Sequence, residues 1–244
     1  LHLCDRRQRQ MCIRDRYVTG VVCSEMPALF SEEALKAQSV AARTYALKKD
    51  SVGATLVAST SDQVYKTNSE LKSMWGNSFD TYYAKVKKAV MSTKGEVMMY
   101  NGKYIDALYF STSNGRTEDP IYVWNYSAPY LKSVDCKWDI GTKFFNATKT
   151  IPISELNQKL GVNINSVNDI QIKSQTTGGR VNSIVIGGKE FTGTNVRMLL
   201  GLRSADFSVS ESGNNIVFTT KGWGHGVGTV SYTHLRAHET CADL

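Results

Sequence analysis

SEEALKAQSVAARTYALK, residues 31–48, is the stretch that decides the first half of the fold. Ser31 is a common helix N-cap residue, and Glu32 and Glu33 follow it in the first turn, where the helix dipole favours negative charge. Alanines at positions 34, 37, 41, 42 and 46 favour the helical state and let a neighbouring element approach closely. The sequence therefore predicts a helix over residues 32–48.

The segments on either side of this helix have different characters. The short β-branched run Tyr17–Cys23 predicts a strand, and Pro27 keeps Met26 extended. Asp62–Tyr65 is expected to be a loop or a short strand. Apolar residues near helical spacing over 78–92 predict a second helix that packs against the rest.

The second half of the chain consists mainly of predicted strands. Asn101-Gly102, between two apolar runs, predicts a hairpin turn. Ser154 and Thr194 are each expected to open a short helix, and Gly161 closes the first of these. Further strands are expected at residues 170–173, 181–186, 207–210 and 216–219. Helices early and strands late, mostly in hairpins, predict an α+β fold with an antiparallel, partly barrel-like sheet.

The composition limits the possible functions. The chain has 244 residues, 41% hydrophobic and 21% charged, which is typical of a globular protein with a core. No apolar run is long enough to span a membrane, and no signal-peptide pattern is visible. The net charge of +7 suits a polyanionic partner such as the cell wall. No Lys/Arg cluster with interleaved aromatic residues occurs, so nucleic acid is not expected as a partner.

The two ends differ from the rest of the chain. Residues 1–16 and 231–244 show neither alternation nor helical period, so we expect them to be foreign, peripheral tails around a single domain over residues 17–230. The HLRAHET stretch in the second tail has a spacing that differs from the HExxH pattern of zinc enzymes. No zinc site is expected there.

The five cysteines follow no metal-ligand spacing. Cys23 and Cys136 are the two that lie well inside the chain. They form either a disulfide, which requires their Cα atoms to lie within about 7 Å, or two separate buried thiols. The sequence leaves both possibilities open.

Four segments with specific residue patterns follow one another along the chain: GVVCSEMPALFSEEALKAQSVAARTYAL (20–47), DQVY (62–65), STKGEVMMYNGKYIDALYFSTSNGRTE (92–118) and the region 197–228, with LGLRSADF and KGWGHGVG. In this order they resemble the stage II sporulation protein D family. The resemblance implies a lytic transglycosylase that cuts peptidoglycan glycan strands without a cofactor, outside the bacterial membrane, in processes such as engulfment during sporulation.

The resemblance also implies an alternative function, and the chain differs from the family at both ends. Some relatives are named amidase enhancers, which implies a protein that binds the cell wall and stimulates an N-acetylmuramoyl amidase without cutting glycan itself. Family members usually carry a membrane anchor ahead of the position of Tyr17, and they continue past Gly228 with a further helix. We therefore expect a truncated catalytic domain that lacks its anchor.

Within this resemblance Glu25 is the catalytic acid, next to an N-terminal active-site helix. A lytic transglycosylase needs one protonated carboxyl group to donate to the glycosidic oxygen, after which the sugar's own C6 hydroxyl closes onto the anomeric carbon. A second carboxylate is not required, unlike in paired-carboxylate hydrolases. Met26 and Phe30 are expected to exclude water and raise the pKa of Glu25. Alternatively, Glu25 caps the helix or pairs with Lys36 or Arg43.

Three further residues of the first half are candidates for binding substrate: Gln38, Arg43 and Tyr65. The resemblance implies that the planar guanidinium of Arg43 binds sugar oxygens, and the alternative is an ion pair with a nearby acid. Gln38 lies about 140° from Arg43 around the helix, so the two need not share a face.

Two loops of the second half complete the candidate site. Ser111, Thr112 and Ser113 form a polar turn that either holds a sugar or fixes Glu25, or is simply a solvated hairpin end. Phe110 stands where some family members supply a zinc-binding histidine, so no metal is expected.

Trp223 and His225 lie in the glycine-dense stretch 222–228. His225 either hydrogen-bonds substrate or orients Glu25, or it is a buried structural histidine. No GxSxG motif accompanies it, so a Ser–His nucleophile is not expected. We expect Glu25, Arg43, the turn 111–113 and His225 to line one groove, because a glycan-cleaving acid must reach a sugar held by several elements.

Overall fold

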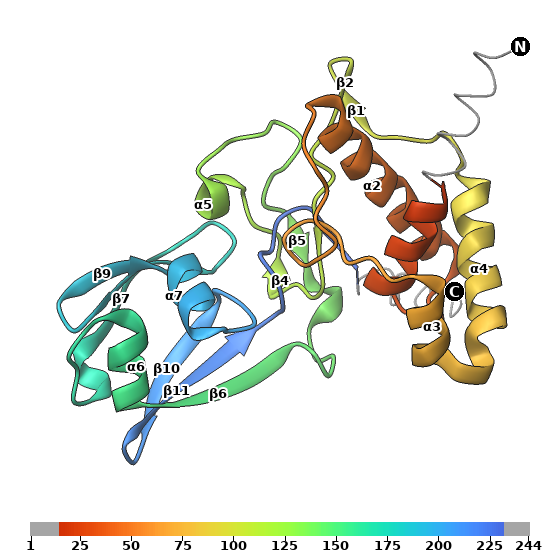
Figure 1. The fold of residues 1–244 in the computed structure, drawn as a ribbon. Helices are drawn as coiled ribbons and strands as arrows, with labels where there is room; N and C mark the ends of the chain where they lie inside the picture. The colour runs from red at the N-terminus through yellow and green to blue at the C-terminus, as the bar shows by residue number, and fades with distance from the viewer. Residues whose placement is uncertain (1–14, 232–244) are drawn as a thin grey trace, which may run out of the picture. The chain divides into compact units, whose positions relative to one another are not determined.

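The computed structural model describes residues 15–231, which divide into two compact units between Leu108 and Tyr109 (Figure 1). Both units lie within the region that the sequence predicts as one domain. The first unit is mainly helical, and the second combines short sheets with helices, so the α+β prediction is confirmed. Among residues 15–231, no helix is both long enough and apolar enough to cross a bilayer.

Helices dominate the first unit. They are an N-terminal helix (residues 15–25), α2 (Glu32–Ser51), α3 (Asn68–Trp75) and α4 (Phe79–Ser92). The helices predicted at 32–48 and 78–92 are confirmed as α2 and α4, which pack side by side (Figure 1). Ser31 caps α2, since its hydroxyl accepts a hydrogen bond of 3.2 Å from the backbone N–H of Ala34.

The prediction of a strand over residues 17–23 is wrong, because this segment belongs to the N-terminal helix. Residues 18–23 are all buried, so apolar and polar residues do not alternate here with the period of either a helix or a strand. The sequence pattern therefore could not distinguish the two. The hydroxyls of Thr19 and Ser24 donate to the carbonyls of Asp15 and Gly20, one turn earlier. The polar side chains of the buried helix are thereby satisfied locally.

The predicted hairpin at Asn101-Gly102 is confirmed. Strands β1 (Met99–Tyr100) and β2 (Lys103–Tyr104) pair antiparallel across it. Both turn residues have positive φ, 48° for Asn101 and 73° for Gly102. This is the backbone twist that a two-residue turn needs to match the twist of its strands, and asparagine and glycine tolerate it best.

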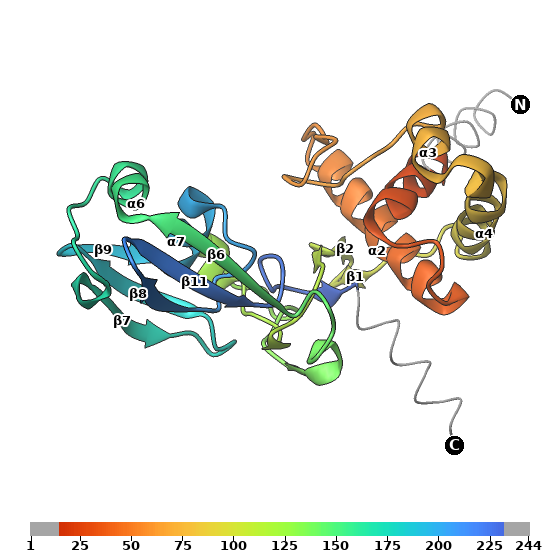
Figure 2. The same ribbon diagram turned by 90° about the horizontal axis from the view of Figure 1, so that it is seen from below.

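The second unit contains several small sheets. Its main strands are β6 (Asn146–Pro152), β7 (Ile170–Gln175), β8 (Val181–Ile186), β9 (Lys189–Thr192), β10 (Phe207–Ser212) and β11 (Asn215–Lys221). They form two antiparallel three-stranded sheets, β10-β11-β6 and β7-β8-β9, and Figure 2 shows β6 and β11 running side by side. The predicted strands are therefore confirmed, but no sheet among the described residues closes, so the barrel-like arrangement is not found.

Short strands hold the candidate loops of this unit. They are β3 (Tyr109–Phe110), β4 (Gly115–Arg116), β5 (Asp135–Cys136) and β12 (Thr229–Val230), and a short helix α5 (Ile121–Trp124) lies among them. β3 pairs with β12 in parallel and β4 with β5 antiparallel. The turn 111–113 therefore lies between two paired segments.

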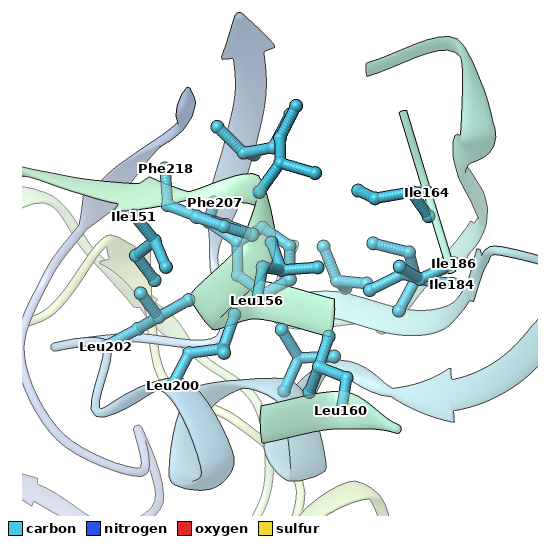
Figure 3. Packing of buried hydrophobic residues seen from close by; sticks show 14 residues of the cluster. Ile151, Leu156, Leu160, Ile164, Ile184, Ile186, Leu200, Leu202, Phe207 and Phe218 are labelled. Atoms are coloured by element: carbon cyan, nitrogen blue, oxygen red, sulfur yellow. The ribbon is translucent and has the colours of Figure 1, made fainter. Parts of the chain in front are cut away.

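One hydrophobic cluster fills the space between the two larger sheets and the helices α6 (Ile153–Leu160) and α7 (Gly193–Leu200). Figure 3 shows its side chains meeting from both sheets and both helices, with Leu156 of α6, Ile184 of β8 and Phe218 of β11 at zero exposure. This cluster is the core that supports the loops of the second unit.

Of the three predicted ends of the two short helices, one is confirmed and two are shifted. The predicted start of α6 at Ser154 is wrong, because the helix begins at Ile153 with Pro152 at the N-cap position. Gly161 ends α6 in the left-handed conformation, with φ of 62°, as predicted. The predicted cap of α7 at Thr194 is wrong, because Thr192 holds that position and its hydroxyl accepts from the N–H of Asn195. Both threonines precede the same apolar run, so the sequence alone could not fix which one starts the helix.

Candidate functional site

Glu25 is the last residue of the N-terminal helix, and its carboxyl group is held by a loop distant in sequence. The backbone N–H of Val64 donates a hydrogen bond of 2.6 Å to Glu25 Oε1. Burial raises the pKa of Glu25, and the Val64 hydrogen bond opposes this by stabilising the charged form. The C-terminal end of a helix also disfavours negative charge. The carboxyl group thus has the partly desolvated surroundings that the sequence predicts.

The structural alternatives for Glu25 are realised by other residues, since Ser31 caps α2 and other acids pair with the two cations. Lys36 pairs with Glu33, at 2.7 Å, and Arg43 pairs with Asp15, at 3.6 Å. Glu25 is therefore not needed to neutralise either cation.

The segment 62–65 docks directly onto the N-terminal helix. The rings of Tyr17 and Tyr65 stack, with centroids 5.5 Å apart and planes 12° from parallel. A Cβ atom at Gly20 would lie 2.4 Å from the Tyr65 ring, so glycine at this helical position is what lets the ring approach. Tyr65 therefore lies in the same cluster as Glu25, as predicted for a site residue.

Gln63 connects this segment to two helices. Its Oε1 accepts a hydrogen bond of 3.1 Å from the Tyr17 hydroxyl, and its Nε2 donates one of 3.2 Å to the carbonyl oxygen of Ala42 in α2. The side chain is fully buried. We call Tyr17, Glu25, Gln63, Val64 and Tyr65 the Glu25 cluster.

Asp62 anchors the start of the segment. Its carboxylate accepts hydrogen bonds from the Tyr45 hydroxyl (2.7 Å) and the Val57 N–H (2.9 Å), and it pairs with Lys49 Nζ at 2.8 Å. Burial, followed by the charge of Asp62, raises the pKa of Tyr17 to about 12. Tyr17 is therefore a neutral donor at physiological pH.

Sequence reasoning missed Tyr17, Gln63 and Asp62 as members of the site. The family pattern includes the DQVY segment, but of its residues only Tyr65 is predicted to belong to the site. Tyr17 was assigned to a strand, where its face could not be inferred. One signal for Tyr17 is available in the sequence. Tyr17 lies about two helical turns before Glu25, which places both residues on one side of a helix.

Arg43 is committed to the interior of the first unit. Its guanidinium donates to the carbonyl oxygens of Val90 (3.0 Å) and Glu96 (3.2 Å), at and beyond the end of α4, and it contacts Thr93 Oγ1 at 3.5 Å. Together with the ion pair to Asp15, these contacts agree with the alternative role of Arg43, an ion pair with a nearby acid. The substrate-binding role of Arg43 stays a prediction.

Gln38 is also internal to the first unit, with 1% of its surface exposed. Neither of its side-chain polar atoms has a hydrogen-bond partner among residues 15–231. A buried amide usually finds such a partner in protein or ordered water. Its predicted role in substrate binding stays a prediction.

In the second unit, the two predicted loops are brought together. Thr112 and Trp223 exchange backbone hydrogen bonds of 3.0 and 2.8 Å, and the hydroxyls of Ser111 and Thr112 lie 3.1 Å apart. The Ser113 N–H donates to a carboxylate oxygen of Asp139 at 2.5 Å. The turn is therefore an ordered, partly buried structure rather than a solvated hairpin end.

The ring of His225 is fixed by the backbone on both sides. Nδ1 accepts from the Val227 N–H at 3.1 Å, so Nε2 carries the proton and donates to the Tyr109 carbonyl, also at 3.1 Å. The ring lies 4.8 Å from that of Trp124 and 5.8 Å from that of Phe110. Burial lowers the pKa of His225 to about 4, so it is neutral at physiological pH. These are the features of a structural histidine.

Trp223 presents an open aromatic surface. It is 40% exposed, the guanidinium of Arg203 lies 4.3 Å from its ring centroid, and the Phe144 ring lies at 6.0 Å. Such an exposed aromatic group beside a cation can bind a sugar face and its anionic substituents.

The predicted site residues thus form two sets, one in each unit. Glu25 and Tyr65 belong to the first, whereas the turn 111–113, Trp223 and His225 belong to the second. A single groove lined by both sets stays a prediction.

Among residues 15–231, no group of three or more His, Cys, Asp or Glu is placed to hold a metal ion. Cys23 and Cys136 are both buried thiols.

Comparisons with known proteins place this chain in a family. A family profile described as "Stage II sporulation protein" matches residues 9–100. The chain is 44% identical, over 227 residues, to "Stage II sporulation protein D" of Bacillus subtilis (strain 168), and 42% identical to the protein of that name in Bacillus amyloliquefaciens. Each alignment covers 89% of this chain and 66% of the relative.

A more distant relative is "Amidase enhancer" of Bacillus subtilis (strain 168), 30% identical over 268 residues, which span 87% of this chain and 36% of the relative. The chain belongs to the stage II sporulation protein D family.

The profile match begins inside the segment 1–16 that the sequence predicts to be foreign. Residues 1–14 and 232–244 lie outside the described residues, and the prediction that the ends are foreign stays a prediction.

The burial of Arg43 predicts a structural effect on mutation. Arg43→Met leaves Asp15 without its buried cation and the end of α4 without its donors, so we expect a loss of about 3 kcal/mol in the free energy of unfolding. Chemical denaturation followed by circular dichroism measures this loss. Lys87→Met, at an exposed position of α4, is the control and should change stability by less than ~0.5 kcal/mol. Equal stability of both variants would show that the guanidinium is not structural.

The raised pKa of Glu25 predicts a pH-dependent effect of Glu25→Gln. The stability that comes from keeping this carboxyl protonated is complete below its ordinary pKa of 4.5 and is lost as pH rises through the folded value. Glutamine cannot ionise and still accepts the Val64 N–H. The variant should therefore gain stability relative to the native chain between pH 4 and pH 8, as measured by denaturation across that range. A difference that is independent of pH would contradict the raised pKa.

Proposed function

We propose that this protein is a peptidoglycan lytic transglycosylase in which Glu25 is the general acid. The observation that carries the proposal is the half-buried Glu25 carboxyl group, whose pKa is raised by burial and whose Oε1 is held by the Val64 N–H at 2.6 Å. A general acid works best when its pKa lies near the working pH, and burial moves a carboxyl group in that direction. Membership of the stage II sporulation protein D family and the amidase-enhancer relative support a role at the cell wall.

The reaction requires one acid that acts twice. Glu25 donates its proton to the glycosidic oxygen, and the bond from this oxygen to the anomeric carbon breaks. The C6 hydroxyl of the same sugar forms a new bond to the anomeric carbon and loses its proton to the Glu25 carboxylate. The products are a shortened strand and an anhydro-muramic end, and Glu25 is protonated again for the next cycle.

The proposed substrate is a glycan strand, in particular one stripped of its stem peptides. The chain carries a net charge of +7, which suits an acidic polymer. Trp223 with Arg203 at 4.3 Å offers an aromatic face and a cation for sugars that carry carboxylates. The proposed place of action is the outer side of the bacterial membrane, in wall remodelling such as engulfment during sporulation.

The second candidate function is a non-catalytic one. The amidase-enhancer relative, 30% identical, favours a protein that binds the wall and stimulates an amidase partner. The two functions differ in one product, since only the transglycosylase leaves anhydro-sugar ends.

The proposal predicts that Glu25→Gln abolishes cleavage and leaves glycan binding intact. The variant keeps the shape of the side chain and removes its transferable proton, so the rate of glycan cleavage should fall by a factor of at least ~100. Purified protein is incubated with peptide-free glycan strands, and anhydro-muramic ends are measured by mass spectrometry. Glu33→Gln, an exposed acid of α2, should cleave like the native chain.

Full cleavage by Glu25→Gln would contradict the proposed mechanism. Glycan binding without cleavage by the native chain, together with faster release of stem peptides by an added amidase, would instead support the enhancer function.

A further inference from the structure

The backbone geometry around Glu25 points to two further residues of the proposed reaction. We propose that Gln63 and Tyr17 are positioning residues, which hold the Val64 N–H on Glu25 Oε1 and thereby place the transferable proton on Oε2. This inference rests on the proposed function, because it assigns the proton that the general acid donates.

The two carboxyl oxygens of Glu25 have different surroundings. Oε1 accepts the Val64 N–H at 2.6 Å. In a protonated carboxyl group the carbonyl-type oxygen is the stronger acceptor and the other oxygen bears the proton. An N–H fixed on Oε1 therefore favours the form in which Oε2 is the O–H donor. Within residues 15–108, no protein group donates to Oε2. That oxygen is thus the one available to a glycosidic oxygen.

The side chain of Gln63 fixes the direction of the Val64 N–H. Residues 63–66 belong to neither a helix nor a strand, so no regular ladder orients this peptide group. The buried side chain of Gln63 instead bridges the Tyr17 hydroxyl and the Ala42 carbonyl, at 3.1 and 3.2 Å. A side chain whose terminal amide is held through both its oxygen and its nitrogen leaves its own backbone, and the peptide that follows it, little freedom to rotate.

The Gln63 bridge lies next to the hydrogen bond that holds Glu25. Tyr17 and Glu25 lie on the same helix, and Gln63 and Val64 are neighbours in the segment 62–65, which we call the docking segment. The pair of contacts Tyr17–Gln63 and Glu25–Val64 therefore fastens one segment to one helix at two points. The Tyr65 ring, stacked on Tyr17 and seated over Gly20, provides packing at the same place but no hydrogen bond to the carboxyl group.

Other charged and titratable groups surround the cluster. Tyr17 comes from the same helix as Glu25, Asp62 and Tyr65 come from the docking segment, and Tyr45 and Lys49 come from α2 and contact Asp62. The variants below leave Asp62, Tyr45 and Lys49 in place. A change in the titration of Glu25 can then be assigned to the loss of the Val64 hydrogen bond.

The experiment compares Gln63→Met and Tyr17→Phe with the unaltered chain. Gln63→Met keeps the length of the side chain and removes its amide, and with it the hydrogen bonds to Tyr17 and Ala42. Tyr17→Phe keeps the stacked ring and removes the hydroxyl. Tyr83→Phe, in α4 and away from the Glu25 cluster, is the matched control. The titration of the Glu25 carboxyl carbon is followed by NMR, and glycan cleavage is measured as a function of pH.

We expect the pKa of Glu25 to rise in both variants, and more in Gln63→Met, because the charged form loses a donor. The alkaline limb of the kcat profile should move to higher pH with it. At the pH optimum kcat should fall about 10-fold to 100-fold, with little change in KM, because the acid is misplaced while glycan binding is retained. Tyr83→Phe should match the native chain in all three measurements.

An unchanged Glu25 titration in a folded Gln63→Met variant would overturn the inference and leave Gln63 as a packing residue only. If Gln63→Met does not fold, an unchanged titration in Tyr17→Phe decides in the same way. If the native chain cuts no glycan, the proposed function fails, and the NMR titration still decides whether Gln63 and Tyr17 position the carboxyl group.

Discussion

The candidate site of the first unit depends on the hydrogen bond by which the Val64 N–H holds Glu25, because it joins a helix to a loop 39 positions away in the sequence. Burial and the hydrogen bond act on the carboxyl group in opposite directions. Burial raises its pKa and so favours the protonated form. The Val64 N–H limits that rise, because it stabilises the carboxylate that remains after the proton is donated. The docking segment is therefore part of the acid's environment as well as part of the fold.

A similar constraint organises the second unit, where buried polar groups replace apolar packing under the candidate loops. Glu118 and Arg180 are both nearly inaccessible and lie 3.7 Å apart, and the Glu118 N–H donates to the carbonyl of Gly226 at 2.7 Å. A Cβ at Gly226 would lie 2.3 Å from the Arg180 guanidinium. Close packing against an arginine thus explains Gly226, whereas Gly222 approaches the backbone of residues 112–114 and Gly224 approaches Phe110. These approaches fix the loop that carries Trp223 and the neutral ring of His225.

Local signals in the sequence predicted most of the elements, and contacts between distant residues explain what was missed. Ser31 and the alanines predicted α2, and Asn101-Gly102 predicted its hairpin. The N-terminal helix was mistaken for a strand because a run buried on all sides has no period to read. α3 was overlooked although Thr67 and Glu70 form a capping box, which is a local signal. Glu25 and Tyr65 could be chosen from the family pattern. Gln63 stands in the same pattern, but its contacts could not be predicted, because its partners lie 46 and 21 positions away.

Amide hydrogen exchange at Val64 is the most direct measurement of whether the docking segment holds Glu25. If it does, the Val64 amide exchanges far more slowly than an exposed loop amide, and this protection is lost in Glu25→Ala while the amides of α2 keep theirs. Exchange at the rate of an unprotected peptide in the native chain would contradict the hydrogen bond, and with it the environment assigned to the acid.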